Sequence, residues 1–179
     1  MSISIQEAMA GDAADIARIY NQGIEDRGAT FETEPRSAEA IAGTLASSGR
    51  FPTLVAVDGG VVLGWASLSP YRPRACYAGI AEFSIYLDRT ARGRGLGRQL
   101  LLALVDAARE HGYWKLVSRI FPFNAASRGL CRSCGFREVG VYEKHGRLDG
   151  QWLDVVIVER LIPENIPLAD AASETGLHA

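Results

Sequence analysis

The segment Arg92-Gly-Arg-Gly-Leu-Gly97 decides how the rest of the chain is interpreted. It follows an apolar run with strand character and precedes leucines and alanines that recur at helical spacing. Glycine lets backbone N–H groups approach a ligand closely, and the start of a helix adds unpaired N–H donors and a partial positive charge. With the charges of Arg92, Arg94 and Arg98 nearby, the segment is typical of a pyrophosphate-binding loop; the alternative is a tight turn without a ligand.

The two commonest phosphate-binding motifs do not fit this segment. A P-loop needs Gly-Lys-Ser or Gly-Lys-Thr at the helix start, which is missing here. A dinucleotide fingerprint needs a third glycine, but that position is Arg98 when the motif starts at Gly93 and Leu100 when it starts at Gly95. What remains is R-x-x-G-x-G, which resembles the acetyl-CoA pyrophosphate loop of the GNAT superfamily of N-acetyltransferases.

Outward from this loop, strand-like and helix-like segments alternate. Apolar and β-branched runs predict strands at Ser4–Ala8, Thr53–Val57, Val61–Leu68, Gly79–Leu87, Leu116–Ile120, Val139–Tyr142 and Trp152–Leu161. Helical spacing and capping residues predict helices from Asp12 to about Ile24, from Ser37, from about Leu100 to Gly112, and at Ala126–Cys134. This order belongs to the α/β or α+β classes. The resemblance implies the GNAT fold, a central mixed, mostly antiparallel sheet flanked by helices, with acetyl-CoA bound where strands splay.

Length and charge limit the organisation and the partners. The 179 residues fit one domain, which we place at 1–162, and we expect the Ala-, Asp-, Glu- and Pro-rich tail at 163–179 to be poorly ordered. A net charge of −2 without a block of like charges argues against nucleic acid or a membrane surface as a partner. No apolar run approaches the roughly 20 residues of a membrane span, and the N-terminal residues lack a signal-peptide pattern.

The cysteines point to a reducing compartment. Cys76, Cys131 and Cys134 form an odd number, which does not suit a disulfide framework, so we expect a cytoplasmic protein. Cys131-Arg-Ser-Cys134 spells C-x-x-C at the end of a short helix without a second pair, and we interpret the two as buried thiols. No metal site is predicted, because a zinc site would need two further ligands.

Two more segments extend the resemblance to the cofactor arm. Asn124-Ala-Ala-Ser127, followed by Cys134-Gly-Phe136, resembles the N-x-x-S…G-F segment of the superfamily, whose Asn and Ser contact the pantetheine arm. The resemblance also implies that a strand backbone pairs with the pantetheine amides as a β-ladder does. The implied acetyl-CoA-binding set is Ile85, Leu87, Arg92, Gly93, Arg94, Gly95, Leu96, Gly97, Arg98, Asn124 and Ser127.

A narrower resemblance concerns the substrate. Phe31-Glu-Thr-Glu-Pro35, Arg72-Pro-Arg-Ala-Cys-Tyr77, Ala81-Glu82 and Asp149-Gly-Gln-Trp-Leu-Asp-Val155 look like phosphinothricin N-acetyltransferases and their relatives acting on methionine sulfone, methionine sulfoximine and arsinothricin. This implies a homodimeric enzyme that acetylates the α-amine of a small amino acid or toxic analogue and confers resistance. The alternatives are acetylation of another amine, such as a protein N-terminus, a lysine or a polyamine, and a non-catalytic acyl-CoA-binding module.

Glu82 is the candidate catalytic base. It stands within an otherwise apolar strand beside the implied cofactor strand. Loss of hydration in such a place favours the neutral form of a carboxylate, which suits a base that works near neutral pH. We expect Glu82 to act through one or more waters. The alternative is an ordinary strand glutamate that faces solvent or pairs with an arginine.

Four residues are candidates for substrate binding besides Glu82. Arg72 and Arg74 flank a proline, and their planar forks match carboxylate, phosphinate or arsonate oxygens. Phe31 and Tyr77 are candidate pocket walls. The alternatives are solvated loop arginines and ordinary core packing.

The acid that protonates the leaving thiolate stays unassigned. Many superfamily members have a tyrosine four residues after the serine of N-x-x-S, and this chain has Cys131 there. Cys131, Tyr142, His145, which is expected in a loop, or water are the alternatives. The backbone N–H of Leu87 is a candidate donor to the thioester oxygen as it becomes an oxyanion.

Overall fold

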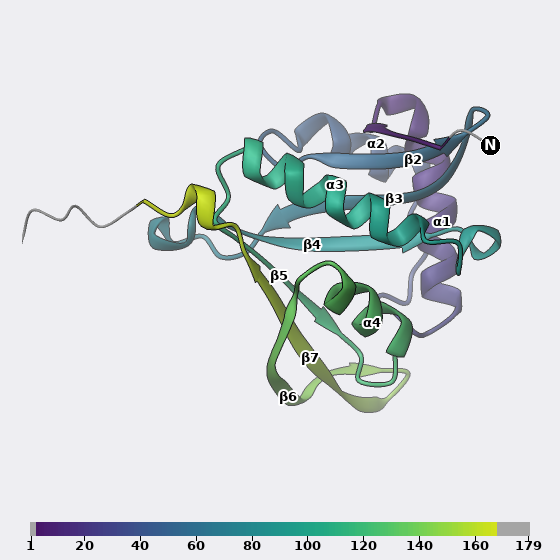
Figure 1. Cartoon of the computed structure of the whole chain (residues 1–179). Coiled ribbons are helices and arrows are strands. Elements are labelled where there is room, and N and C mark those ends of the chain that lie inside the picture. Colours follow the sequence, from purple (N-terminus) through teal and green to yellow (C-terminus); the bar gives the residue numbers. More distant parts are fainter. Residues whose placement is uncertain (1–2, 168–179) are drawn as a thin grey trace, which may run out of the picture.

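The computed structural model describes residues 3–167 of the chain (Figure 1). Its strands are β1 (Ser4–Glu7), β2 (Thr53–Asp58), β3 (Val61–Pro70), β4 (Ile80–Leu87), β5 (Lys115–Ile120), β6 (Arg137–Leu148) and β7 (Gln151–Leu161). Its α-helices are α1 (Ala13–Glu25), α2 (Ala38–Ser47), α3 (Leu96–Glu110) and α4 (Ala125–Ser133). The predicted order of strands and helices is therefore confirmed across the described chain.

All seven strands form one sheet in the order β1-β2-β3-β4-β5-β7-β6. Every neighbouring pair is antiparallel except β4 and β5, which are parallel. The β4–β5 ladder ends where Glu82 lies opposite Val117. Beyond that pair the two strands diverge, and Figure 1 shows β5 and β7 turning away from β4. The predicted mixed, mostly antiparallel sheet with splayed strands is thus present.

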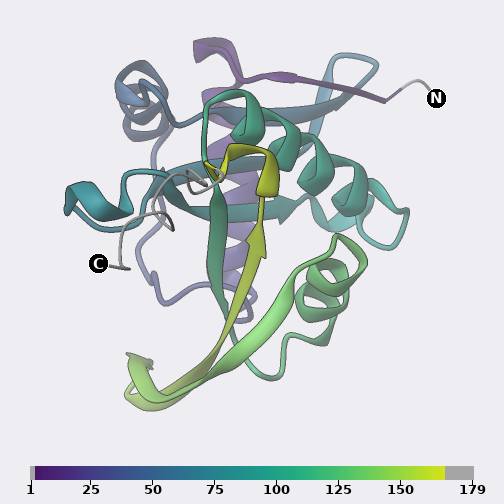
Figure 2. The same cartoon turned by 60° about the vertical axis from the view of Figure 1, so that its left-hand side comes forward.

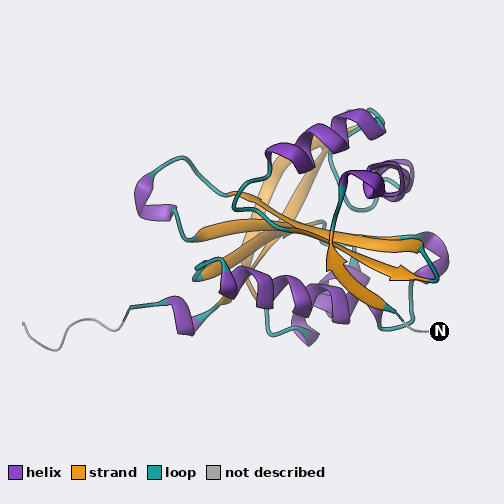
Figure 3. Ribbon diagram, turned by 90° about the horizontal axis from the view of Figure 1, so that it is seen from above, coloured by secondary structure: helices purple, strands orange, loops and turns teal. Residues whose placement is uncertain are grey.

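Helices cover both faces of the sheet (Figure 3). On one face α3 buries Leu100, Leu101 and Leu104 against β3 and β4, which the helical spacing of these leucines predicted. On the other face α1 buries Ile16 and Ile19 against β2 and β3. The sheet therefore separates two apolar layers, and any site at its splayed edge is open to both faces.

The β6–β7 hairpin forms an arm that extends away from the first four strands (Figure 2). Asp149 and Gly150 make its turn with φ of 47° and 81°, as the Asp-Gly pair predicts for a tight hairpin. The predicted strand Val139–Tyr142 is wrong in extent, because β6 spans Arg137–Leu148. The expected loop at His145 is wrong as well. The ladder shifts register between Tyr142 and Gly146, so an irregular bulge lets His145 stay within the strand.

The predicted start is correct for α2 and differs in its cap for α1. Ser37 caps α2 as predicted, since its hydroxyl accepts from the N–H of Ala40 at 3.1 Å. Asp12 occupies the position before α1, but its carboxylate accepts from the N–H of Met9 at 2.8 Å and not from α1.

The expected loose tail is wrong at its beginning. Pro163–Asn165 forms a short 3-10 helix, and Asn165 Nδ2 donates to the carbonyls of Arg109 and Tyr113 at 2.8 Å each. These two bonds fasten the segment to the end of α3. The rest of that prediction, from residue 168 on, lies outside the described residues. Within residues 3–167, each helix is too short or too polar to span a bilayer.

Candidate active site

Two glycines shape the loop between β4 and α3. Gly93 and Gly95 have φ of +75° and +77°, a left-handed conformation that residues with a Cβ rarely adopt. A Cβ at either position would meet no atom within 4 Å, so the backbone angle is the reason for glycine and crowding is not. Gly95 directly precedes α3, whose first N–H groups have no partner within the helix. The loop and helix start together form an anion-binding backbone.

Asp88 fixes this loop to α1. The buried carboxylate accepts from the N–H and the hydroxyl of Thr90, at 2.9 and 2.6 Å. It also accepts from Gln22 Nε2 at 3.1 Å and from the guanidinium of Arg18. The Thr90 hydroxyl, with the other donors, holds the pKa of Asp88 well below its usual range. Asp88 is therefore an ionised anchor at the end of β4.

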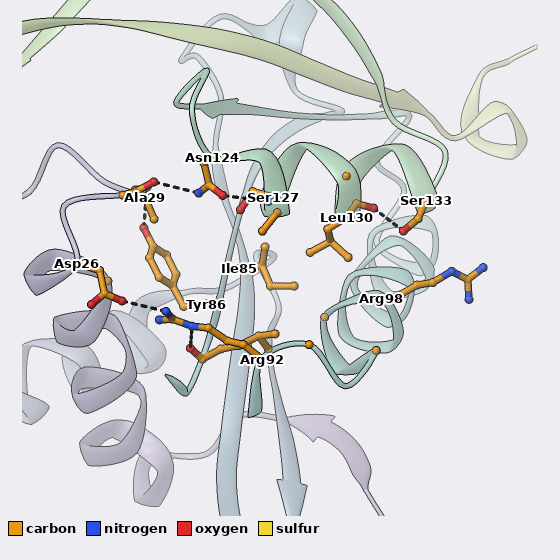
Figure 4. Close-up of a pocket in the computed structure, with 18 of the residues that line it drawn as sticks. Asp26, Ala29, Ile85, Tyr86, Arg92, Arg98, Asn124, Ser127, Leu130 and Ser133 are labelled. Atoms are coloured by element: carbon orange, nitrogen blue, oxygen red, sulfur yellow. Dashed lines mark hydrogen bonds and ion pairs between the residues drawn. The ribbon is translucent and has the colours of Figure 1, made fainter. Parts of the chain in front are cut away.

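Arg92 connects the same loop to the end of α1. Its Nη1 pairs with Asp26 Oδ2 at 3.0 Å, and its Nε donates to the carbonyl of Leu87 at 3.3 Å (Figure 4). Asp26 also pairs with Arg89 at 2.6 Å, and mainly through this contact its pKa is lowered. The arginine of the R-x-x-G-x-G pattern thus lies across the loop mouth with its orientation fixed by a carboxylate and a carbonyl.

The edge of β4 beyond the ladder with β5 faces the gap. Alternate residues of a strand direct their backbone groups to the same side. The N–H of Asp88 donates to Leu63 of β3 at 2.9 Å, whereas the carbonyl of Phe83 accepts from Ser118 Oγ of β5 at 2.9 Å. The N–H groups of Ile85 and Leu87 therefore point away from β3. Within the described chain no strand pairs with that edge after Glu82.

A cavity of about 720 Å³ lies along this edge, between the glycine loop and α4 (Figure 4). Its walls include Ile85, Leu87, Arg92, Gly93, Gly95, Gly97, Arg98, Asn124 and Ser127. The structure therefore brings together the predicted cofactor set except Arg94 and Leu96. Arg94 is exposed beside the cavity lining, and the Leu96 side chain is buried in the core, so only its backbone N–H is available to a ligand. The volume is within the range of cofactor pockets.

A smaller cavity of about 80 Å³ occupies the gap between β4 and β5. It shares Ile85, Tyr86, Asn124 and Ser127 with the larger cavity, and Arg119 and Cys131 also line it. The two cavities are therefore adjacent along the splayed edge.

Asn124 holds the wall of both cavities in place. Its Oδ1 accepts from the N–H of Ser127 at 3.0 Å, which caps α4, and its Nδ2 donates to the carbonyl of Gly28 at 3.0 Å. The amide thus joins α4 to the segment after α1. The sequence predicted a ligand contact for Asn124, and the structure adds this supporting role.

Glu82 forms an ion pair with Arg119, one of the alternatives that the sequence left open. The Glu82 side chain is 23% exposed and that of Arg119 is 47% exposed. Glu82 lines neither cavity, but its partner lines the smaller one. The carboxylate is therefore next to the gap and accessible to water, so the base role stays a prediction.

The other candidate substrate residues do not reach the cavities. Arg72 and Arg74 lie over the rings of Tyr71 and Tyr77, at 5.3 and 5.9 Å, in the loop before β4. Phe31 packs edge-on against Phe121, with ring centroids 4.8 Å apart. None of Arg72, Arg74, Tyr77 and Phe31 lines either cavity. Their substrate roles stay predictions.

Several site residues were missed from the sequence. Arg119, Tyr86, Asp26 and Asp88 all lie at the cavities or hold their walls. A signal existed for two of them. Asp88-Arg-Thr90 after an apolar strand is a capping pattern, and Arg119 is a charged residue within the predicted strand Leu116–Ile120.

The candidate acids can be compared by place and by pKa. Burial, and then the neighbouring Cys134, raise the pKa of Cys131 to about 12. Both thiols are buried, as predicted. Tyr142 and His145 lie on β6 and line neither cavity.

Among residues 3–167, no three His, Cys, Asp or Glu side chains are grouped so as to hold a metal ion.

The comparisons with known proteins agree with this geometry. The family model of the acetyltransferase (GNAT) family matches residues 16–136. The chain belongs to the acetyltransferase (GNAT) family. Among GNAT relatives, an L-methionine sulfoximine/L-methionine sulfone acetyltransferase of Pseudomonas aeruginosa is 39% identical over 163 residues, covering 89% of this chain and 94% of the relative.

Two solved GNAT structures share the fold. The ribosomal-protein-alanine N-acetyltransferase from Brucella melitensis has a TM-score of 0.86 at 35% identity, covering 89% of this chain and 99% of that one. A phosphinothricin acetyltransferase from Sinorhizobium meliloti in complex with acetyl-CoA has a TM-score of 0.84 at 33% identity, covering 90% and 89%. The GNAT fold expected from the sequence is confirmed, and the chain is an acetyltransferase.

Proposed function

We propose that this acetyltransferase uses acetyl-CoA to acetylate the α-amine of a small amino acid or a toxic amino-acid analogue. The observation that carries the proposal is the meeting of the glycine loop with the splayed edge of β4 in one cavity of about 720 Å³. The relative named for methionine sulfoximine and methionine sulfone and the solved phosphinothricin acetyltransferase support the amino-acid class. Acetylation removes the charge of the amine, so the expected biological outcome is resistance to the analogue.

The cavity fits the two halves of acetyl-CoA by chemistry. The left-handed backbone at Gly93 and Gly95, with the α3 N-terminus and Arg92, suits a pyrophosphate. The outward N–H groups of Ile85 and Leu87 suit the amides of pantetheine, which would extend the sheet as a further strand. Such main-chain pairing holds an extended ligand without requiring particular side chains.

The reaction needs few groups from the protein. Glu82 accepts a proton from the substrate ammonium, directly or through water, and the freed amine nitrogen bonds to the thioester carbonyl carbon. A free backbone N–H on the exposed edge of β4 stabilises the oxyanion that forms. The carbon–sulfur bond then breaks, the nitrogen gives up its second proton, and the thiolate takes up a proton, so that an amide and the CoA thiol are formed. Water can carry that proton from the nitrogen to the sulfur, whereas burial raises the pKa of Cys131 to about 12 and makes this thiol a poor proton donor to the leaving thiolate.

We also propose a cytoplasmic homodimer that works without a metal. The β6–β7 arm carries large apolar side chains that are about half exposed, namely Val139, Val141, Tyr142 and Trp152. Isolated exposed apolar residues are common, but a group on one arm suits a contact between subunits. The free cysteines suit a reducing compartment.

A second acceptor is favoured by one comparison. One solved structure is named ribosomal-protein-alanine N-acetyltransferase, so its named acceptor is an alanine of a ribosomal protein. Such an acceptor offers no free carboxylate beside the amine.

Release of the CoA thiol tests the proposal. Acetyl-CoA is incubated with L-methionine sulfone, L-methionine sulfoximine, phosphinothricin, spermidine or an alanine-initiated peptide. Saturable release with the amino-acid analogues is the expected result. Release with the peptide alone would favour the second acceptor, and no release despite bound acetyl-CoA would favour a non-catalytic module.

A further inference from the structure

Arg119 is the cationic side chain at the gap between β4 and β5. It lines the smaller cavity, whereas Arg72 and Arg74 line neither cavity. Its guanidinium pairs with Glu82, and both groups are partly open to solvent, at 47% and 23% exposure. Exposed ion pairs of this kind contribute little to stability, so the fold does not depend on this one.

The register of the sheet explains why these two charges meet. Glu82 lies opposite Val117 in the last pair of the β4–β5 ladder. Since alternate side chains of a strand share a face, Arg119 and Phe121 project on the same face as Val117 and Glu82. The pair therefore stands at the mouth of the gap, and the Phe121 ring, packed edge-on with Phe31, provides an apolar wall beside it.

We propose that Arg119 binds the α-carboxylate of an α-amino-acid substrate while Glu82 faces its α-ammonium. The inference rests on the proposed function and narrows its substrate class to free α-amino acids. A carboxylate and an ammonium on one carbon have opposite charges a few ångströms apart, and the Arg119–Glu82 pair presents the two complementary charges side by side. The entering carboxylate takes the guanidinium fork from Glu82, because the planar fork binds a carboxylate through two parallel N–H donors.

This exchange has two consequences for the reaction. It frees the Glu82 carboxylate from its cation at the moment when the ammonium arrives beside it. It also orients the amine, because one end of the substrate is held on β5 and the acetyl group is expected along the β4 edge at Ile85. An amine without an α-carboxylate leaves the ion pair closed and is expected to react poorly.

The test compares one substrate with and without its carboxylate. L-methionine sulfone and its α-carboxamide share the amine and the side chain, and the carboxamide imitates the first residue of a peptide. Both are assayed by CoA thiol release with the wild-type chain, Arg119→Gln, Arg119→Lys and Arg137→Gln. Arg137 is a matched control, because it pairs with Glu159 on β6 and β7 and lines neither cavity.

The wild-type chain is expected to prefer the acid over the amide by about 30-fold or more in kcat/KM. A ratio of about this size corresponds to the loss of one hydrogen bond to a charged group. Arg119→Gln is expected to raise KM for the acid and bring that preference to within about threefold, with KM for acetyl-CoA unchanged. Arg119→Lys should retain part of the preference, and Arg137→Gln all of it. If the role of Arg119 were purely structural, Arg119→Gln would lower kcat/KM equally for the acid and the amide and leave their ratio unchanged.

The outcomes separate this inference from the proposed function. Equal turnover of acid and amide by the wild-type chain, or an unchanged ratio in Arg119→Gln, would overturn the role of Arg119 and leave the acetyltransferase proposal standing. Absence of turnover with every amine would contradict the proposed function and the inference together. If Arg72→Gln lost the preference for the acid while Arg119→Gln kept it, the α-carboxylate of the substrate would be bound by the loop before β4 and not by Arg119.

Discussion

Asp88 and Thr90 form a closed turn directly before the glycine loop, with both the N–H and the hydroxyl of Thr90 donating to one carboxylate oxygen, at 2.9 and 2.6 Å. The other oxygen receives Gln22 and Arg18 from α1. A buried carboxylate with four donors is an anchor whose loss leaves those donors without a partner. The placement of the glycine loop relative to the sheet therefore depends on Asp88.

Asp88→Asn is expected to lower the free energy of unfolding by about 2–4 kcal/mol. The amide has one acceptor oxygen in place of two and no negative charge, so buried donors lose their acceptor and Arg18 loses its counter-charge. It should also weaken acetyl-CoA binding by loosening the loop. Urea denaturation and calorimetric titration measure the two effects. Asp15→Asn is the matched control: Asp15 also pairs with Arg18 but is exposed, so a loss under about 1 kcal/mol is expected. Equal losses in the two variants would contradict the anchor role.

The same carboxylate predicts how stability depends on pH. Hydrogen bonds from Thr90, with those from Arg18 and Gln22, lower the pKa of Asp88 in the folded state, whereas the unfolded value is about 3.9. A lowered pKa means that the stabilisation is complete above about pH 4 and is lost as pH falls toward the folded pKa. The difference in unfolding free energy between wild type and Asp88→Asn should thus shrink below about pH 4. Denaturation at neutral, mildly acidic and strongly acidic pH measures it, and a constant difference would contradict the assignment.

Gly95→Ala tests whether acetyl-CoA binding depends on the left-handed backbone conformation at this position. The substitution forces a left-handed φ of +77° on alanine without a steric contact, so a loss of about 1–2 kcal/mol is expected. Gly60→Ala is a close control in the β2–β3 turn, with φ of +85° and an equally open position. Both variants should lose similar stability in denaturation, but only Gly95→Ala should weaken acetyl-CoA in titration. Equal affinities would show that the glycine loop does not hold the cofactor.

Cys131→Ala tests whether the cysteine at the usual tyrosine position is the general acid. Since burial raises the pKa of Cys131 to about 12, we expect kcat to stay within about threefold of wild type. Cys134→Ala, the neighbouring buried thiol, controls for the packing loss of about 1 kcal/mol. A fall of about 100-fold in kcat for Cys131→Ala alone would make this thiol the acid.

Glu82→Gln tests the base. The amide keeps the size of the side chain but accepts no proton, so kcat should fall by about 100-fold or more. Affinity for acetyl-CoA should stay within about twofold, because Glu82 does not line the larger cavity. Glu138→Gln, whose carboxylate also pairs with arginines, should keep full activity. Turnover that persists in Glu82→Gln at neutral pH would leave Glu82 as an ordinary paired glutamate.

Local patterns in the sequence predict the fold well, and the reason is visible in particular residues. The spacing of Leu100, Leu101 and Leu104 and the glycines at 93 and 95 report requirements of single segments, namely one apolar helix face and two left-handed backbone positions. Such requirements can be read without knowing the neighbours in space. The cofactor set that the resemblance implied lines one cavity except for Arg94 and Leu96.

Contacts between distant segments could not be predicted in this way. The Glu82–Arg119 pair depends on where the parallel β4–β5 ladder ends, and the Asn124–Gly28 bond depends on how α4 meets the segment after α1. His145 was misplaced because a bulge, which keeps the strand continuous, has no clear sequence signal there. The ladder of β6 with β7 overrides the local preference of Glu143–His145 for a loop.

Transfer of an isotopic label tests the central claim most directly. The chain is mixed with acetyl-CoA carrying ¹³C at the thioester carbonyl and with L-methionine sulfone, and the carbon is followed by NMR. The account predicts that the thioester signal decays while an amide carbonyl signal, coupled to the α-proton through the amide nitrogen, grows in equal amount. A label that stays in the thioester, or appears only as acetate, would contradict the claim that this cavity transfers an acetyl group to the α-amine of an amino acid.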